Sequence, residues 1–168
     1  MTDRYREVVI GVGNEFRRDD GAGPAVVDRL RGELPANVRL TVSDGEPAGL
    51  LEAWTGADLA IVVDAVISGA APPGRLYRVL AADRHNGGLD DLGGGASTHS
   101  LGLGTAVGLS RALGRLPAVL IVHAVEGADF GHGPGLSAEV GSVIDDLVAA
   151  VLTDLRRPPR PGIRAPRR

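Results

Sequence analysis

The sequence predicts a three-layer α/β domain, in which a twisted, mostly parallel five-stranded sheet is flanked by helices on both faces. Short apolar runs alternate along the chain with segments of helical apolar spacing, which is typical of parallel strands joined by helices. Hydrophobic residues make up 43% of the chain but aromatic residues only 3%, so the core must consist of aliphatic side chains. The length of 168 residues indicates one domain.

The first part of the chain predicts three strands and two helices. The strands are expected at residues 7–12, 38–42 and 59–63, and the last of these, LAIVV, has the strongest core pattern. Pro24 suits the first turn of a helix that we expect to reach about Leu34. Leu50, Leu51 and Trp54 indicate a second, short helix. This alternation predicts a doubly wound sheet.

The second part predicts two more strands and two more helices. The strands are expected at 75–80, at an edge of the sheet, and at 118–125. A Gly-rich loop at 81–96 precedes a helix from Ser97 to Leu113, and a final helix should run from the N-cap Ser137 to Leu155. Six arginines and no acidic residue occur at 156–168, and we expect this Pro/Arg-rich tail to be disordered. The predicted domain therefore covers residues 1–155.

Composition excludes several classes of protein. The chain has no cysteine, which rules out a thiol nucleophile, a disulfide framework and a cysteine metal site. The charged start, MTDRYREVV, does not resemble a signal peptide, and no apolar run approaches the roughly 20 residues of a membrane span. We therefore expect a cytoplasmic protein that binds neither membranes nor nucleic acid.

Four polar residues are expected to meet at one edge of the sheet: Asp20, Asp44, Asp64 and His99. Each follows a strand or begins a helix, and open α/β sheets bind ligands beyond the carboxyl ends of their strands. One imidazole with two carboxylates suits nickel, zinc, manganese or iron. For Asp64, which follows an apolar run, we favour a functional role at the ligand crevice over a structural one. Asp20 and its neighbour Asp19 could instead cap a helix, and Asp44 could belong to a simple Asp-Gly turn.

The glycine-rich segment GVGNEFRRDDG does not fit a nucleotide-binding motif. A dinucleotide fingerprint needs glycine where Phe16 stands, and a P-loop needs a lysine, which this chain lacks. The hydroxyl residues around His99 lack a G-x-S-x-G elbow, which argues against a serine hydrolase. We expect structural roles for His85, His123 and His132.

Four stretches, taken together, resemble the hydrogenase maturation endopeptidases of the nickel–iron enzymes. They are GVGNEFRRDDGAG at 11–23, DGEPAG at 44–49, DAVISGAAPPG at 64–74 and STHSLGL at 97–103, and the resemblance continues through Glu126 and GLS at 135–137. Glu46 departs from the pattern, because many members have glycine there. The resemblance implies a twisted five-stranded sheet flanked by helices and metal binding by Asp20, Asp64 and His99.

The resemblance also implies an activity. A cytoplasmic, monomeric endopeptidase would remove the C-terminal extension of a nickel–iron hydrogenase large-subunit precursor after nickel insertion, and the nickel would come with the precursor. Asp44 is then the candidate catalytic base, unless the metal itself polarises the scissile carbonyl or activates water. Two alternatives remain: a nickel-binding assembly chaperone without hydrolysis, and a nucleotide-binding regulator.

Overall fold

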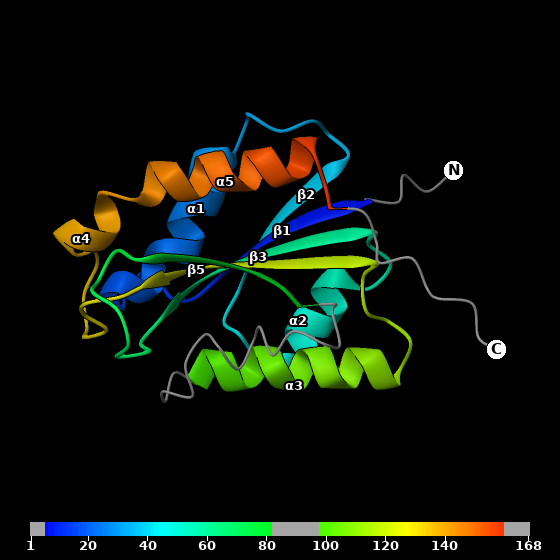
Figure 1. Ribbon diagram of the computed structural model, residues 1–168, viewed down its shortest axis with the longest axis horizontal. Coiled ribbons are helices and arrows are strands. Elements are labelled where there is room, and N and C mark those ends of the chain that lie inside the picture. Colours follow the sequence, from blue (N-terminus) through cyan, green and yellow to red (C-terminus); the bar gives the residue numbers. More distant parts are fainter. Residues whose placement is uncertain (1–5, 82–97, 160–168) are drawn as a thin grey trace.

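The three predicted layers are present in the computed structural model (Figure 1), which describes residues 6–81 and 98–159, without the side chains of 98–101. The elements are β1 (Glu7–Val12), η1 (Arg18–Gly21), α1 (Ala22–Leu30), β2 (Val38–Ser43), α2 (Pro47–Trp54), β3 (Leu59–Val66), β4 (Leu76–Leu80), α3 (Thr98–Ala112), β5 (Val119–Glu126), α4 (Ala138–Gly141) and α5 (Ile144–Arg156). None of the helices in the described ranges is long and apolar enough to cross a membrane.

The sheet has the strand order β2-β1-β3-β5-β4. All neighbouring pairs are parallel except β4 with β5, so the predicted edge position of the fourth strand is confirmed. Every residue of the central strands β3 and β5 is buried, as expected for parallel strands that helices cover on both faces.

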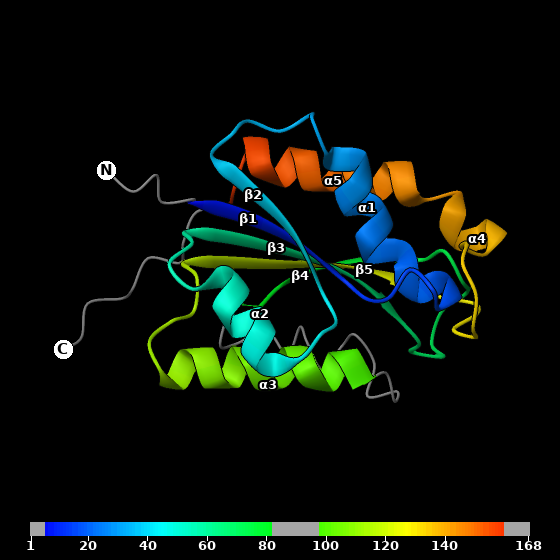
Figure 2. The same ribbon diagram turned by 180° about the vertical axis from the view of Figure 1, so that it is seen from behind.

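Helices α1 and α5 cover one face of the sheet, and α2 and α3 cover the other (Figures 1 and 2). Successive strand residues alternate between two cores: Val8 and Ile10 belong to the core under α2 and α3, whereas Val9 belongs to the core under α1 and α5. The aliphatic composition therefore serves two layers of packing.

Three element boundaries differ from the sequence prediction. Helix α1 ends at Leu30 because Arg31 adopts an extended conformation, although Leu34 still packs on the core. Strand β3 continues past Asp64, because Ala65 and Val66 pair with the end of β5. The final helix is interrupted between α4 and α5, where Val143 leaves helical geometry with φ −112° and ψ 3°.

The order of the strands reverses between β1 and β3, because the next strand after β1 lies on its other side. In open α/β sheets such a switch point opens a crevice at the carboxyl ends of the two strands. Gly23 packs the start of α1 directly onto both strands: a Cβ there would lie 2.4 Å from the carbonyl oxygen of Val12 and 2.6 Å from that of Val63. The segment between β1 and α1 is therefore held at this crevice.

Candidate active site

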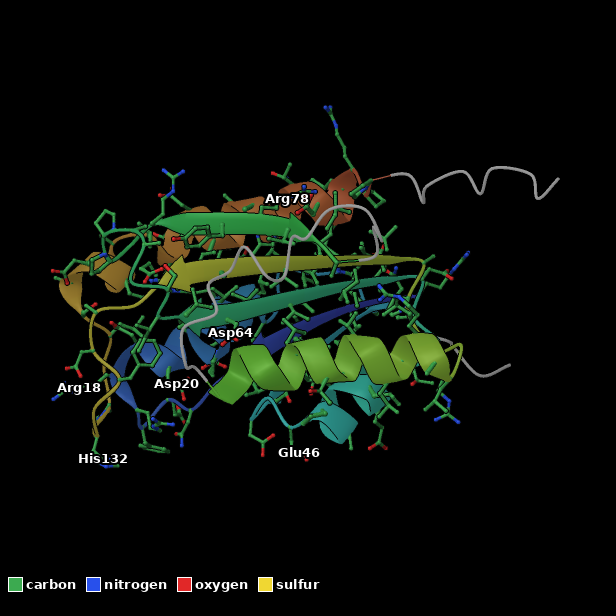
Figure 3. All side chains as sticks on the ribbon, turned by 60° about the horizontal axis from the view of Figure 1, so that its bottom comes forward. Arg18, Asp20, Glu46, Asp64, Arg78 and His132 are labelled. Atoms are coloured by element: carbon green, nitrogen blue, oxygen red, sulfur yellow. The ribbon has the colours of Figure 1, made fainter. Side chains whose placement is uncertain are left out.

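Two of the predicted site residues lie together at the crevice. Asp20 belongs to η1, which follows β1 and contacts β3, and Asp64 belongs to β3 itself. In Figure 3 both side chains lie at the end of the sheet where α3 begins. Each is only 2% exposed. Sequence and topology thus place two buried carboxylates at the switch point, one on β3 and one on the turn that follows β1.

The backbone orients both carboxylates. One oxygen of Asp20 accepts the amide hydrogen of Asn14 at 3.0 Å, and one oxygen of Asp64 accepts that of Ala65 at 2.8 Å. Val62 and Val66, two positions to either side of Asp64, pack in the same core as Leu103 of α3. Because strand side chains alternate, Asp64 also points to the face that α3 covers.

Asp44 is exposed and directly follows β2, in the turn before α2. Its side-chain oxygen accepts the amide hydrogen of Glu46 at 3.1 Å, which is the turn geometry that the sequence allowed for. Glu46, the departure from the family pattern, caps α2 by accepting the amide hydrogen of Ala48. The local turn is thus intact with glutamate at this position.

Helix α3 packs against that same turn. A Cβ on Gly102 would lie 2.2 Å from the carbonyl oxygen of Gly45, so only glycine allows this approach. His99 lies one turn earlier, in the first turn of α3, and its side chain is outside the described residues. Figure 3 shows that α3 begins at the end of the sheet where Asp20 and Asp64 lie. The fold therefore brings all four predicted residues to one end of the sheet.

Two buried carboxylates at the same end of the sheet supply oxygen ligands for a metal ion, and the predicted third ligand, His99, would add a nitrogen. Among the side chains that the structure describes, no group of three or more His, Asp or Glu residues could hold a metal ion. Asp20 and Asp64 supply two of the three predicted ligands, and the third, His99, is not among these side chains. The three-residue ligand set stays a prediction.

Asp19, which precedes Asp20, has a separate environment that the sequence did not reveal. Its carboxylate is fully buried and accepts hydrogen bonds from Ala128, Asp129 and Ser137. Burial alone would raise the pKa of Asp19, but the hydrogen bonds from these residues outweigh it and the pKa is lowered. The group is therefore held as a carboxylate. Only its partners, more than 100 positions away in the chain, distinguish it from Asp20.

The predicted structural roles of the other histidines can be checked for His123 and His132. His123 is buried in β5, with its Nε2 2.8 Å from a carboxylate oxygen of Asp154 on α5. Arg78 donates to both oxygens of that carboxylate at 3.0 and 2.7 Å. This cluster joins β4, β5 and α5 on the face of the sheet opposite to Asp64, and it supports a structural role for His123. His132 is exposed in a loop, and His85 lies outside the described residues.

An open α/β sheet with buried carboxylates at its switch point is an arrangement typical of enzymes. Comparison with known proteins identifies the family. The family model for hydrogenase maturation proteases matches residues 24–154, and the chain belongs to this family. The hydrogenase 2 maturation protease of Escherichia coli K12 is 28% identical over 153 residues, which cover 90% of this chain and 91% of that protein.

Solved structures agree with this assignment. The hydrogenase maturating endopeptidase HybD from Escherichia coli matches with a TM-score of 0.77 and 28% identity over 90% of this chain and 92% of its own. A hydrogenase 2 maturation peptidase from a Thaumarchaeota archaeon matches with a TM-score of 0.64 and 28% identity over 89% and 97% of the two chains. The predicted family, fold class and peptidase activity are confirmed, and neither the chaperone nor the nucleotide-binding alternative is favoured.

Proposed function

We propose that this peptidase removes the C-terminal extension of a nickel–iron hydrogenase large-subunit precursor after nickel has been inserted. The observation that carries the proposal is the pair of buried carboxylates, Asp20 and Asp64, at the crevice between β1 and β3 beside the beginning of α3. The family to which this chain belongs also supports the proposal, because its members are hydrogenase maturation proteases.

Nickel on the precursor would act as the recognition element. Two carboxylates with the imidazole of His99 form an incomplete ligand set, so nickel already held by the precursor can complete its coordination there. A precursor without nickel lacks this interaction and binds more weakly, which gives specificity through a missing contact. The metal is in this view part of the substrate.

Asp44 is the group that we propose as general base for the attacking water. It is exposed, and the turn that carries it packs against α3 near His99, so it can reach a peptide that lies across the crevice. The alternative is that the precursor's nickel polarises the scissile carbonyl or activates the water. We further propose that the enzyme works as a cytoplasmic monomer that docks on the precursor.

The proposal is tested with nickel-loaded and nickel-free precursor of a large subunit, using the C-terminal mass of the precursor as readout. We expect a short C-terminal peptide to be lost only from the loaded form, and His99→Ala and Asp64→Asn to abolish this loss. Equal cleavage of both forms would remove nickel recognition from the proposal. If neither form is cut but both bind, the chaperone alternative is correct.

The role of Asp44 is tested separately with Asp44→Asn, since the amide keeps the shape of the turn but cannot accept a proton. We expect this variant to bind the loaded precursor as the wild type does and to lose at least about 100-fold in cleavage rate. Glu52→Gln, an exposed carboxylate on α2, is the matched control and should cleave normally. Normal cleavage by Asp44→Asn would leave the metal-activated route.

A further inference from the structure

Asp19 joins the candidate site to the loop that follows β5. Its carboxylate accepts four hydrogen bonds from that loop: from the amides of Ala128, Asp129 and Ser137 at 2.7, 2.9 and 2.7 Å, and from the Ser137 hydroxyl at 2.9 Å. Its own amide donates to the carbonyl of Asp129 at 2.9 Å. A fully buried carboxylate with this many donors is fixed in one position.

Backbone hydrogen bonds extend this connection on both sides of Gly133. Its amide donates to the carbonyl of Phe16 at 2.8 Å, and its carbonyl accepts the amide hydrogen of Arg18 at 2.9 Å. Arg18 has φ 52°, which is uncommon for a residue other than glycine, and such conformations persist only where their surroundings hold them. Residues 16–19 and 128–137 therefore form one hydrogen-bonded unit.

Asp20 directly follows this unit in the sequence and is hydrogen-bonded to its turn. The amide of Asp20 donates to the carbonyl of Arg17 at 3.1 Å, inside the turn that Asp19 fixes. The carboxylate of Asp19 turns to the loop 128–137, whereas that of Asp20 turns to the amide of Asn14. The two adjacent acids thus face different partners, although they belong to the same turn.

We propose that Asp19 is a positioning residue of this peptidase: it does not touch the substrate, but it fixes the turn from which Asp20 reaches the precursor. This inference rests on the proposed function, in which Asp20 contacts the precursor's nickel. Residues that orient metal ligands typically contribute 10- to 100-fold to affinity or activity. We expect a loss of that size when Asp19 can no longer accept all four hydrogen bonds.

The variant Asp19→Asn provides the test, because it keeps the volume of the side chain but presents an NH₂ group to at least one of the donors. The amide of Asn14, which donates to Asp20, reports where the Asp20 carboxylate lies. We expect NMR hydrogen exchange at Asn14 in Asp19→Asn to accelerate at least about tenfold more than at Ile61 in β3. Asp154→Asn, another buried carboxylate but on α5, should destabilise the fold without this selective effect at Asn14.

The second measurement is kcat/KM for the nickel-loaded precursor, well below the unfolding transition of each variant. We expect Asp19→Asn to lose about 10- to 100-fold, mainly through KM, and Asp154→Asn to retain its activity. Unaltered protection at Asn14, or unaltered kcat/KM, in Asp19→Asn would overturn the inference. If the wild type cuts no loaded precursor, the proposed function fails, whereas exchange at Asn14 still decides whether Asp19 positions Asp20.

Discussion

At the scale of single residues, the partners of a carboxylate determine what it can do. Asp19 and Glu126 are buried, and each accepts four hydrogen bonds from segments distant in the sequence. Glu126 takes its four from Ser68, Gly69 and Tyr77 and thereby holds the connection that follows β3. Such saturated groups fix the segments around them, whereas Asp20 and Asp64 are the carboxylates that we propose for the precursor's nickel.

The cluster of Arg78, His123 and Asp154 should contribute to the stability of the fold. We expect Asp154→Ala to lower the free energy of unfolding by about 2 kcal/mol, because Arg78 and His123 lose a charged hydrogen-bond partner. The loss stays below that of a fully buried pair, because 41% of the Arg78 side chain is exposed and water can replace the carboxylate.

Urea unfolding followed by circular dichroism measures this change, and Asp145→Ala is its control. Asp145 pairs with Arg29, but its side chain is 80% exposed, so its removal should change the free energy of unfolding by less than about 0.5 kcal/mol. Equal effects of the two substitutions would mean that the buried cluster does not stabilise the fold.

At the scale of elements, the approach of α3 to the turn after β2 depends on Gly102. We expect Gly102→Ala to destabilise the protein by about 1–3 kcal/mol, because the new methyl group would overlap the carbonyl of Gly45. Gly104, two residues further along and on the exposed side of the same helix, has nothing within 4 Å of its Cβ position. Gly104→Ala should therefore stabilise by about 0.5–1 kcal/mol, the usual preference of a helix for alanine.

Thermal unfolding of both variants checks this pair of predictions, since both make the same chemical change in one helix. If Gly102→Ala unfolds at the temperature of Gly104→Ala, the contact between α3 and Gly45 is not close. In the expected case, Gly102→Ala should also reduce precursor cleavage, because it moves the turn that carries Asp44.

The strands could be predicted from the sequence because apolar runs buried on both faces have few alternatives. The end of a helix is harder to predict when apolar spacing continues past it. Val140, Ile144 and Leu147 pack in one core on both sides of the break between α4 and α5, so their spacing gave no sign of it. Likewise, carboxylates at strand ends were visible in the sequence, but the separate roles of Asp19 and Asp20 depend on hydrogen bonds to residues 128–137.

At the scale of the whole molecule, we expect stability to fall in acid. Burial lowers the pKa of His123 even though Asp154 opposes this, and the folded protein therefore favours the neutral ring. For Asp154, burial would raise the pKa, but the hydrogen bonds from Arg78 and His123 outweigh it and lower the pKa. For each group, the unfolded chain binds more protons than the folded protein at pH values between the folded-state pKa and the unfolded-state pKa. The free energy of unfolding therefore decreases as the pH is lowered through that interval.

The two groups act in different pH windows. The contribution of His123 is complete above about pH 6.5 and is lost as the pH falls below it, whereas that of Asp154 is lost only below about pH 4. Urea unfolding at pH 7.5, 5.5 and 3.5 measures both steps. A constant free energy of unfolding from pH 7.5 to 5.5 would contradict the first, and His123→Gln should remove that step alone.

The hydrogen-bonded unit of residues 16–19 and 128–137 has a consequence for the order of folding. Its side-chain bonds join residues separated by 109 to 118 positions, whereas β1 pairs with strands much closer in sequence. Contacts between distant residues close the largest loops and require the greatest loss of chain entropy. We therefore expect a newly synthesised chain to assemble β1, β2 and β3 first. It would become competent to process a precursor only when the segment after β5 has been made and has closed on Asp19.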